Sequence, residues 1–314
     1  MLKAREAGSR DEGSHDAEGR EAGSSDALIA PAAAPRTSAR IRRRDQKIVR
    51  TSAGRARVLT LDAGDGAPVR VLVQGGVYQS ATYLDEHRFE PVFAYFRAFD
   101  ALFEAEPALR EAAGHGVQRV LMLGGGGFSY PKHLLTAHEG IALDVVEVDA
   151  GVVRVARRWF FLGELEERLA DPARAHGNAL RINIASGRAY LEAAGPASGS
   201  YDAIVNDTFV GAEPVRGLAT VEAARAARRC LGPGGLYLAN IVSRDEGADV
   251  GFLRDEVATF SQIFEHVHVI DASDGRFGGE ANHLLVATDA PTVFADAIPY
   301  DGDFPGTPLH DVYQ

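Results

Sequence analysis

The chain has 314 residues, of which 46% are hydrophobic and 25% charged, a composition typical of a globular protein of about two domains. A net charge of −11 argues against general nucleic-acid binding, which needs Lys and Arg to neutralise phosphates. No segment approaches the roughly 18 apolar residues of a membrane span, the start lacks a secretory apolar segment, and the single Cys230 excludes an internal disulfide framework. We therefore expect a cytoplasmic protein with neither membrane nor nucleic-acid partners.

The first 45 residues are rich in Gly, Ser, Ala, Glu, Asp and Arg and lack aromatic side chains. Such a segment buries too little apolar surface to offset the entropy lost on ordering, which predicts a disordered tail over residues 1–45. Short apolar runs bounded by Gly and Asp follow at 58–61, 69–73 and 77–83. They predict a small N-terminal antiparallel β domain over residues 46–88.

Aromatic residues recur at helical spacing from Phe89 to Phe103, which predicts a helix packed on the core of a second domain, residues 89–290. Expected strands lie at 119–123, 143–148, 180–184, 201–206, 235–241, 266–270 and 283–287, and expected helices include 151–161, 220–231 and 251–264. This alternation predicts an α/β, Rossmann-like domain with a mostly parallel seven-stranded sheet. Because no clear helix separates the last two strands, we expect an antiparallel hairpin there. Residues 291–314 are rich in Pro and Asp and predict an irregular tail.

In such sheets the ligand binds outside the carboxyl ends of the strands, and three sequence features lie at such ends. The first is a run of four glycines, Gly124, Gly125, Gly126 and Gly127, between a buried strand and a helix that opens near Ser129. Glycine permits a positive φ and lets a ligand approach the backbone closely. A tight turn without a ligand would look the same, so the pattern indicates a nucleotide-type site only together with the other two features.

The second feature is the hydrophobic strand 143–149, which ends in Glu147 and Asp149 about twenty residues after the glycines. An acid at this place can accept hydrogen bonds from both ribose hydroxyls. The two carboxylates share a face of the strand, since strand side chains alternate with a period of two. Asp149 is also well placed to cap the following helix, which leaves Glu147 as the better ribose ligand.

The third feature is the strand 201–206, which delivers Asn206 and Asp207 to its carboxyl end, where we expect Asn206 to contact the cofactor. A carboxylate there faces the expected crevice, where it could orient or deprotonate a nucleophile. The alternative is an aspartate that only caps a loop. No histidine or cysteine pattern typical of a metal site is present, so we expect no metal.

Taken in this order, the features resemble the spermidine synthase superfamily of class I S-adenosylmethionine-dependent transferases, from about Val69 to Thr288. The match includes the segment 71–80 and the turn 231–237. The resemblance implies that Gln79 contacts the nucleoside or the propylamine arm, that Glu147 binds the ribose, and that Asp207 activates the attacking amine. It further implies S-adenosylmethionine or its decarboxylated form as co-substrate, a small amine or other nucleophile as acceptor, and a homodimer.

Three positions depart from the polyamine synthases of this family. The chain has Gly127, Ser186 and Val210 where those enzymes have acids. Ser186 follows the third strand, from where we expect it to contact the cofactor. Because a buried ammonium group without a partner is costly, the missing acids leave three functions open: aminopropyl transfer, methyl transfer, or nucleoside binding without catalysis. The pattern is closer to the spermidine-synthase-like branch of the family.

Overall fold

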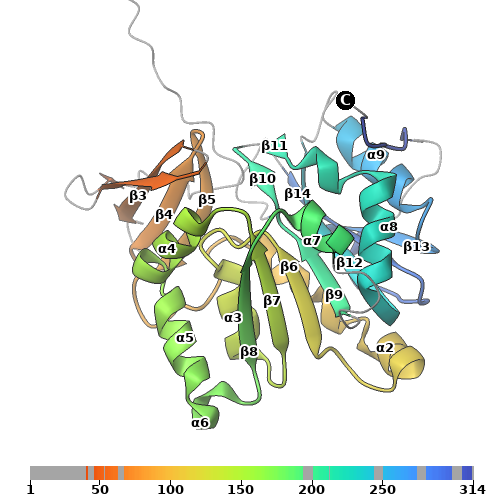
Figure 1. Cartoon of the computed structure of the whole chain (residues 1–314), viewed down its shortest axis with the longest axis horizontal. Helices are drawn as coiled ribbons and strands as arrows, with labels where there is room; N and C mark the ends of the chain where they lie inside the picture. Colours follow the sequence, from red (N-terminus) through yellow and green to blue (C-terminus); the bar gives the residue numbers. More distant parts are fainter. Residues whose placement is uncertain are drawn as a thin grey trace, which may run out of the picture.

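The computed structural model describes residues 40–41, 46–52, 54–62, 67–193, 201–211, 213–243, 250–273, 281–298 and 306–312. These form a large mixed sheet covered by helices on both faces and a smaller antiparallel sheet from the N-terminal region (Figure 1). The predicted α/β architecture is confirmed. Most of the tail predicted over residues 1–45 lies outside the described residues.

The smaller sheet contains only antiparallel pairs, as the sequence predicted. Its strands are β1 (Arg40–Ile41), β2 (Lys47–Thr51), β3 (Gly54–Asp62), β4 (Val69–Gln74) and β5 (Val77–Tyr83). The short β1 lies inside the segment predicted to be a disordered tail and pairs with residues 61 and 62 of β3. Backbone groups at a strand edge recruit such a short partner without needing an apolar side-chain pattern, which is why composition did not indicate it.

The large sheet has eight strands in the order β15-β13-β14-β12-β9-β6-β7-β8. Their bounds are β6 (Arg119–Leu123), β7 (Ala142–Glu147), β8 (Ala179–Ile184), β9 (Tyr201–Asn206), β12 (Leu231–Ser243), β13 (His266–Asp271), β14 (Ala281–Thr288) and β15 (Ala297–Ile298). The run from β12 to β8 is parallel, whereas β14 pairs antiparallel with β12 and β13. The seven predicted strands are all present, and β15 is an additional edge strand within the segment predicted to be irregular.

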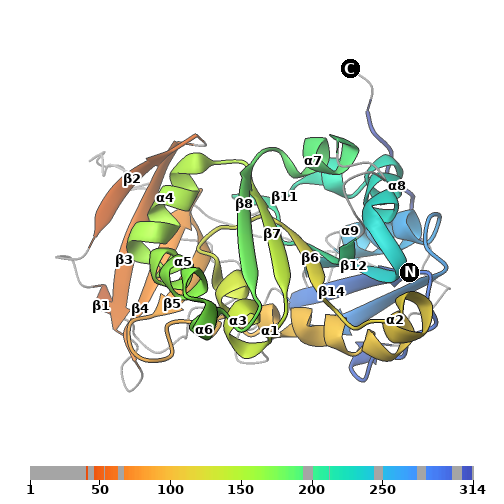
Figure 2. The ribbon, with the colours of Figure 1, turned by 60° about the horizontal axis from the view of Figure 1, so that its bottom comes forward.

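Side-chain alternation along β6 explains why helices cover both faces. Val120 and Met122 belong to one buried cluster, and Leu121 and Leu123 belong to the other. Figure 2 shows the two helical layers on either side of the strands. The first layer contains α1 (Tyr95–Ala98), the 3-10 helix η2 (Phe99–Phe103), α2 (Glu106–Ala113) and α3 (Ser129–Ala137). The second contains α7 (Gly187–Ala193), α8 (Val221–Cys230) and α9 (Val250–Phe260). Together the layers bury the sheet in two cores.

The aromatic run predicted as one helix from Phe89 to Phe103 differs in the structure. Turns and bends occupy most of residues 84–94, α1 begins only at Tyr95, and η2 follows it from Phe99. Pro91 disfavours helical geometry at the residue before it, so the periodic aromatics are presented by a turn and two short helices. Phe96 and Phe99 nevertheless pack in the core with 4% and 0% of their surface exposed.

The smaller sheet packs against the helices α4 (Ala150–Trp159) and α5 (Leu162–Ala170), which α6 (Pro172–Ala175) follows. Lys132 of α3 is buried where this helix meets β5 of the smaller sheet. Its Nζ donates to Thr82 Oγ1 at 2.8 Å and to the carbonyl oxygen of Arg88 at 2.9 Å. Burial lowers the pKa of Lys132 to about 7, although the charge of Glu164 opposes the shift. The junction therefore holds an amine whose hydrogen-bond acceptors are neutral.

Residues 306–312 pack back onto the second helical layer. The backbone N–H groups of Thr307 and Leu309 donate to Asp255 and Thr259 of α9, and Val221 N donates to the carbonyl of Leu309. This part of the expected irregular tail has no regular secondary structure, yet it is fixed by hydrogen bonds.

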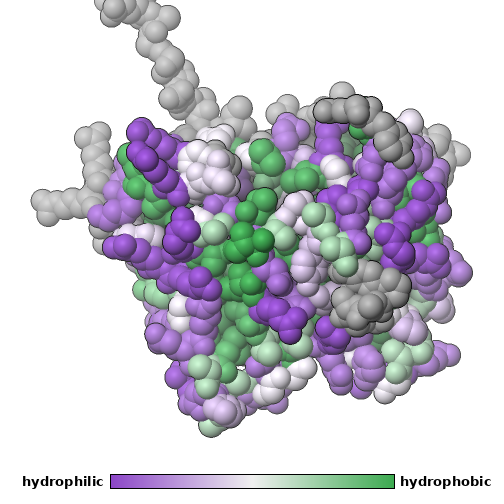
Figure 3. Space-filling model, viewed as in Figure 1, coloured by the Kyte–Doolittle hydropathy of each residue, from purple (hydrophilic) through white to green (hydrophobic). Residues whose placement is uncertain are grey.

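The edge strand β8 carries an apolar surface (Figure 3). Ile184, at the end of this strand, is 52% exposed, and Val148, which follows β7, is 66% exposed.

No helix among the described residues is long and apolar enough to span a membrane.

Candidate functional site

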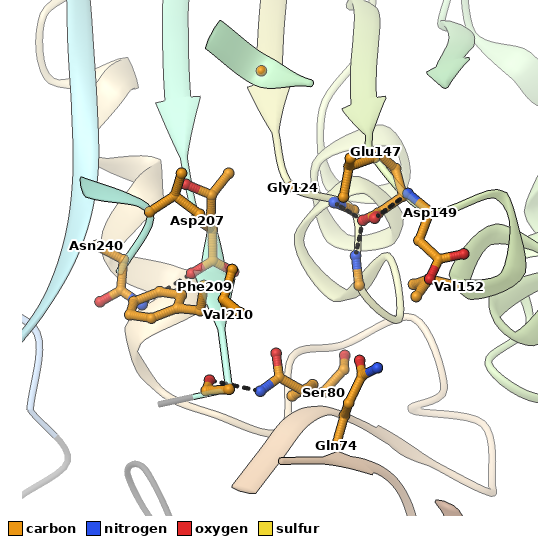
Figure 4. A pocket seen from close by; sticks show the side chains of 18 of the residues that line it. Gln74, Ser80, Gly124, Glu147, Asp149, Val152, Asp207, Phe209, Val210 and Asn240 are labelled. Carbon is orange, nitrogen blue, oxygen red and sulfur yellow. Dashed lines mark hydrogen bonds between the residues drawn. The ribbon is translucent and has the colours of Figure 1, made fainter. Parts of the chain in front are cut away.

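A cavity of about 420 Å³ lies at the carboxyl ends of the parallel strands, where the smaller sheet meets the large one. The loops after β6, β7, β8 and β9 line it together with the end of β12, the β4–β5 hairpin and residues 93–96. Figure 4 shows Glu147 and Gly124 on one side and Asp207 with Asn240 on the other. The cavity is where the sequence predicted the ligand to bind.

The glycine turn after β6 has the backbone conformation that its residues suggested. Gly124 and Gly126 have φ values of +89° and +50°, which residues with a side chain rarely adopt. A side chain at Gly124 would collide with the carbonyl oxygen of Asp207, so the glycine lets the ends of β6 and β9 approach each other. Gly125 and Gly126 also line the cavity, whereas Gly127 faces the Ser80 hydroxyl and Phe160. Gly127 therefore permits packing of α3 against β5.

Glu147 is anchored by backbone amides. One carboxylate oxygen, Oε2, accepts hydrogen bonds from Gly125 N at 2.9 Å and Gly126 N at 3.1 Å. The other, Oε1, accepts from Asp149 N at 3.0 Å. The residue is only 7% exposed, yet it lines the cavity. The carboxylate thus shapes the glycine turn as well as facing the space where a ligand would lie.

Asp149 caps α4, which is the alternative role that the sequence indicated. Its Oδ1 accepts a hydrogen bond from Gly151 N at 2.6 Å. Its Oδ2 accepts bonds from the backbone N–H and the hydroxyl of Ser52, the hydroxyl at 2.8 Å. Asp149 therefore ties the residue after β2 to the large sheet, at the edge of the same cavity.

Asp207 follows β9 and is held by two side chains from distant elements. Asn240 Nδ2 of β12 donates to Asp207 Oδ1 at 2.9 Å, and the Tyr95 hydroxyl of α1 makes a second hydrogen bond. Burial raises the pKa of Asp207 to about 6, against the two hydrogen bonds, which lower it. Burial and the neighbouring carboxylate hold the pKa of Tyr95 well above its usual value, so Tyr95 remains a donor.

Asn206, predicted to contact the cofactor, is directed away from the cavity. Its Nδ2 donates to the Tyr237 hydroxyl at 2.9 Å, and its Oδ1 accepts from the Thr208 hydroxyl at 2.7 Å. Asn206 and Asp207 are adjacent, and adjacent residues in extended backbone point to opposite faces. Only Asp207 therefore lies with the other predicted residues.

Gln79 and Ser186 both line the cavity. Gln79 Nε2 donates to the carbonyl oxygen of Gly211 at 2.9 Å, in the turn between β10 (Phe209–Val210) and β11 (Glu213–Pro214). This bond joins the smaller sheet to the loop that carries Asp207. Ser186 lies just before α7, at the end of β8.

Sequence reasoning missed Arg188, Tyr95 and Asn240, all of which line the cavity. The Arg188 guanidinium pairs with both oxygens of Asp311, at 3.0 and 2.6 Å. Tyr95 lies within the aromatic run from Phe89 to Phe103, where the sequence indicated only core packing, and Asn240 is one polar residue within an apolar strand. Position at the carboxyl end of β12 is the only sequence signal that could have indicated Asn240.

Most of the remaining cavity wall is apolar or aromatic. Tyr78, Phe93, Phe96, Phe209 and Val210 contribute to it. Among the described residues that line the cavity, the carboxylates are those of Glu147, Asp149 and Asp207. Two of these accept backbone N–H groups, so Asp207 is the carboxylate held by side chains alone.

No family model matches the chain, but it is similar in sequence to curated proteins. It is 28% identical over 193 residues to the polyamine aminopropyltransferase of Vibrio vulnificus, covering 61% of this chain and 56% of the relative. Identity to the Prochlorococcus marinus polyamine aminopropyltransferase is 28% over 194 residues, or 62% and 59% of the two chains. Both of these curated homologues are polyamine aminopropyltransferases. The matched region spans less than two thirds of the length of either relative.

Solved structures place the fold in the same group. A probable spermidine synthase from Corynebacterium glutamicum has a TM-score of 0.59 and 25% identity, covering 79% of this chain and 81% of that one. A spermidine synthase in complex with the transition-state analogue AdoDATO has a TM-score of 0.54 at 19% identity, over 80% and 72% of the chains, and so supports the fold alone. The predicted resemblance to spermidine synthases is confirmed.

Proposed function

We propose that this protein transfers the aminopropyl group of decarboxylated S-adenosylmethionine to an amine, with Asp207 as the general base. The observation that carries the proposal is the Asp207 carboxyl group, which has a pKa of about 6 and shares a cavity with the glycine turn and Glu147. A base with a pKa near the working pH is mostly ionised and still accepts a proton effectively. Similarity to polyamine aminopropyltransferases over 61% of the chain supports the same reaction.

The Glu147 side of the cavity fits a nucleoside. A carboxylate offers about four acceptor positions, and backbone N–H groups use three of those on Glu147. We assign the remaining capacity to the ribose hydroxyls. Gly124 and Gly126 leave the backbone accessible beside it, and we assign Gln79 and Ser186 to further contacts with the same ligand. We expect Asp149 to support the nucleoside site indirectly, by capping α4 beside it.

The reaction joins a nitrogen to a carbon and releases a thioether. A bound sulfonium supplies an electrophilic carbon and a neutral leaving group. Asp207 takes the proton that the amine loses, while the nitrogen lone pair forms the C–N bond and the C–S electrons move onto sulfur. Asn240 and Tyr95 fix the carboxylate for this step, and holding the two reactants in line contributes most of the acceleration.

Methyl transfer from intact S-adenosylmethionine is a second candidate, and one observation favours it. Gly127 occupies the place of an acid in the polyamine synthases and packs on Ser80. Within the described cavity wall, Asp207 is the one carboxylate not anchored by backbone amides, so the ammonium of an aminopropyl arm and an amine acceptor would share it. Intact S-adenosylmethionine carries its own carboxylate beside its ammonium and needs no such partner.

Thermal unfolding of the full-length protein with each sulfonium separates the candidates. A ligand at 100 times its Kd adds about 2.7 kcal/mol to stability. We expect stabilisation by decarboxylated S-adenosylmethionine and turnover with an amine acceptor, with putrescine a poor one because it carries two ammonium groups. Glu213→Gln is a control, since this exposed residue of β11 does not line the cavity. Tight binding of S-adenosylmethionine alone would support methyl transfer, and binding without turnover would indicate a non-catalytic homologue.

A homodimer is also proposed, on the exposed apolar residues at the edge of the large sheet. Ile184 is exposed there at the end of β8, and Val148, which also lines the cavity, is exposed after β7. Exposed apolar groups at a strand edge favour association with a second chain. Sedimentation equilibrium should give a dimer that Ile184→Glu dissociates, whereas a monomeric wild-type chain would contradict the proposal.

A further inference from the structure

Asp100, His133 and His138 form a cluster of metal-ligating side chains outside the cavity. One ligand atom from each lies within 4.8 Å of the others, and all three residues are partly buried. Asp100 belongs to η2, His133 to α3, and His138 follows the last residue of α3. None of them lines the cavity. No local sequence pattern indicates the cluster, because Asp100 is separated from His133 by more than thirty residues.

The three side chains are oriented by their surroundings. His133 Nε2 lies 2.8 Å from Asp100 Oδ2, and the Tyr130 hydroxyl donates to the other carboxylate oxygen at 3.1 Å. The His138 ring stacks on Phe103 with 3.8 Å between centroids. Within the part of the chain that the structure describes, the His138 ring nitrogens make no hydrogen bond. The His138 ring therefore has a nitrogen lone pair available for a ligand. The Asp100 carboxylate beside it is held by the Tyr130 hydroxyl.

We propose that Asp100, His133 and His138 bind a zinc ion. Two imidazole nitrogens and one carboxylate oxygen are ligands that Zn²⁺ accepts, with water completing a tetrahedron. Imidazole favours Zn²⁺ over Mg²⁺ and Ca²⁺, which select oxygen ligands. The Tyr130 hydroxyl holds the carboxylate from outside the ligand set, as supporting groups do in metal sites. The 2.8 Å contact between His133 Nε2 and Asp100 Oδ2 already brings an imidazole nitrogen and a carboxylate oxygen together, as binding to one ion requires.

The ion would fasten η2 to α3, and this has a consequence for the cavity. The helix α1, which carries Tyr95, runs directly into η2. Tyr95 contacts Phe99 edge-on with 6.3 Å between centroids, and Phe99 contacts Tyr130 at 5.1 Å. Zinc at Asp100 would therefore rigidify the segment that presents the Tyr95 hydroxyl to Asp207. Its role in the proposal is structural, and it takes no part in group transfer.

A second group of potential ligands provides the matched control. Asp85, Glu86 and His87 also lie within reach of one ion, but Glu86 and His87 are exposed and the three are consecutive on one turn. A group with one imidazole on an exposed turn is a weaker zinc site than the cluster between η2 and α3.

The test is a Zn²⁺ titration by calorimetry on the full-length, chelator-treated protein without a polyhistidine tag. We expect one Zn²⁺ per chain and a higher melting temperature, with no effect of Mg²⁺. Loss of a supporting group weakens metal binding by roughly 10- to 100-fold, and Tyr130→Phe should weaken Zn²⁺ binding by about that amount. His138→Gln removes a ligand and should weaken Zn²⁺ binding by more. His87→Gln should leave the affinity unchanged.

Co²⁺ gives an independent reading at the same site. Absorption of the Co²⁺ protein in the visible region should indicate tetrahedral coordination and should disappear in His138→Gln. His133→Gln is a second variant, should His138→Gln fail to fold. Absence of stoichiometric Zn²⁺ binding would overturn the proposal, as would loss of binding in His87→Gln but not in His138→Gln.

Discussion

The two sides of the cavity hold their carboxylates in different ways. Glu147 accepts three backbone N–H groups from its own strand end and the neighbouring glycine turn. Asp207 is held by the side chains of Asn240 and Tyr95, which come from β12 and α1. Three backbone donors fix the Glu147 carboxylate in place, whereas burial raises the pKa of Asp207 to about 6 despite its two side-chain donors. The first arrangement suits a binding group, and the second suits a group that exchanges a proton.

The largest expected effect is on the proton-exchanging side. Asp207→Asn keeps the shape of the side chain and removes the base, so turnover should fall by about 10²- to 10⁴-fold, the usual contribution of a general base. Binding of a nucleoside that lacks the aminopropyl arm should stay unchanged, since Glu147 is untouched. Steady-state kinetics and a calorimetric Kd measure the two quantities. An equal loss in both would show that the two sides do not divide the work in this way.

Glu147→Ala tests the other side. Nucleoside binding should weaken by about 1.5–3 kcal/mol, the scale of a hydrogen bond to a charged group. Because the carboxylate also anchors three backbone amides, the melting temperature without ligand should fall too, unlike that of a residue that only binds ligand. Calorimetric titration and thermal unfolding of the same sample check both effects. An unchanged affinity would remove Glu147 from the nucleoside site.

Tyr95→Phe should move the pH dependence of turnover. The Tyr95 hydrogen bond lowers the pKa of Asp207, so its loss lets burial raise that pKa above about 6. The base is ionised above its pKa, and activity is therefore lost as the pH falls through it. The acid limb of kcat/KM should shift upward by about one unit, equivalent to 1.36 kcal/mol. Tyr78→Phe is the control, because Tyr78 lines the cavity without a bond to Asp207.

The difference between the two sides also explains what the sequence could predict. Glu147 and the glycines form a local motif whose partners lie about twenty residues apart, so their contact follows from strand and turn spacing. Asp207 was predicted from its place at a strand end. Tyr95 and Asn240 were not, because their approach depends on how α1 and β12 pack, and no local pattern encodes it. Asn206 was predicted to contact the cofactor, but it precedes Asp207 by one residue, and neighbouring side chains in extended backbone point to opposite faces.

The smallest effect is expected from the N-terminal segment. Removal of residues 1–46 takes away β1, which pairs with β3 at two positions only. The melting temperature should change by less than about 2–4 °C, the shift for 1 kcal/mol in a chain of this size. Ser52→Ala should cost more, because it removes a hydroxyl bonded to the Asp149 carboxylate. A larger loss from the deletion would show that the first residues pack on the core.

The buried amine of Lys132 couples unfolding to proton uptake. Its pKa is about 7 in the folded chain, against 10.5 for an exposed lysine. Between these values the unfolded chain binds a proton that the folded chain does not, so stability rises with pH over this interval. At pH 8.5 the proton taken up on unfolding must come from the buffer. The calorimetric enthalpy of unfolding should therefore differ between Tris and phosphate, whose ionisation heats differ, and Lys132→Met should reduce that difference.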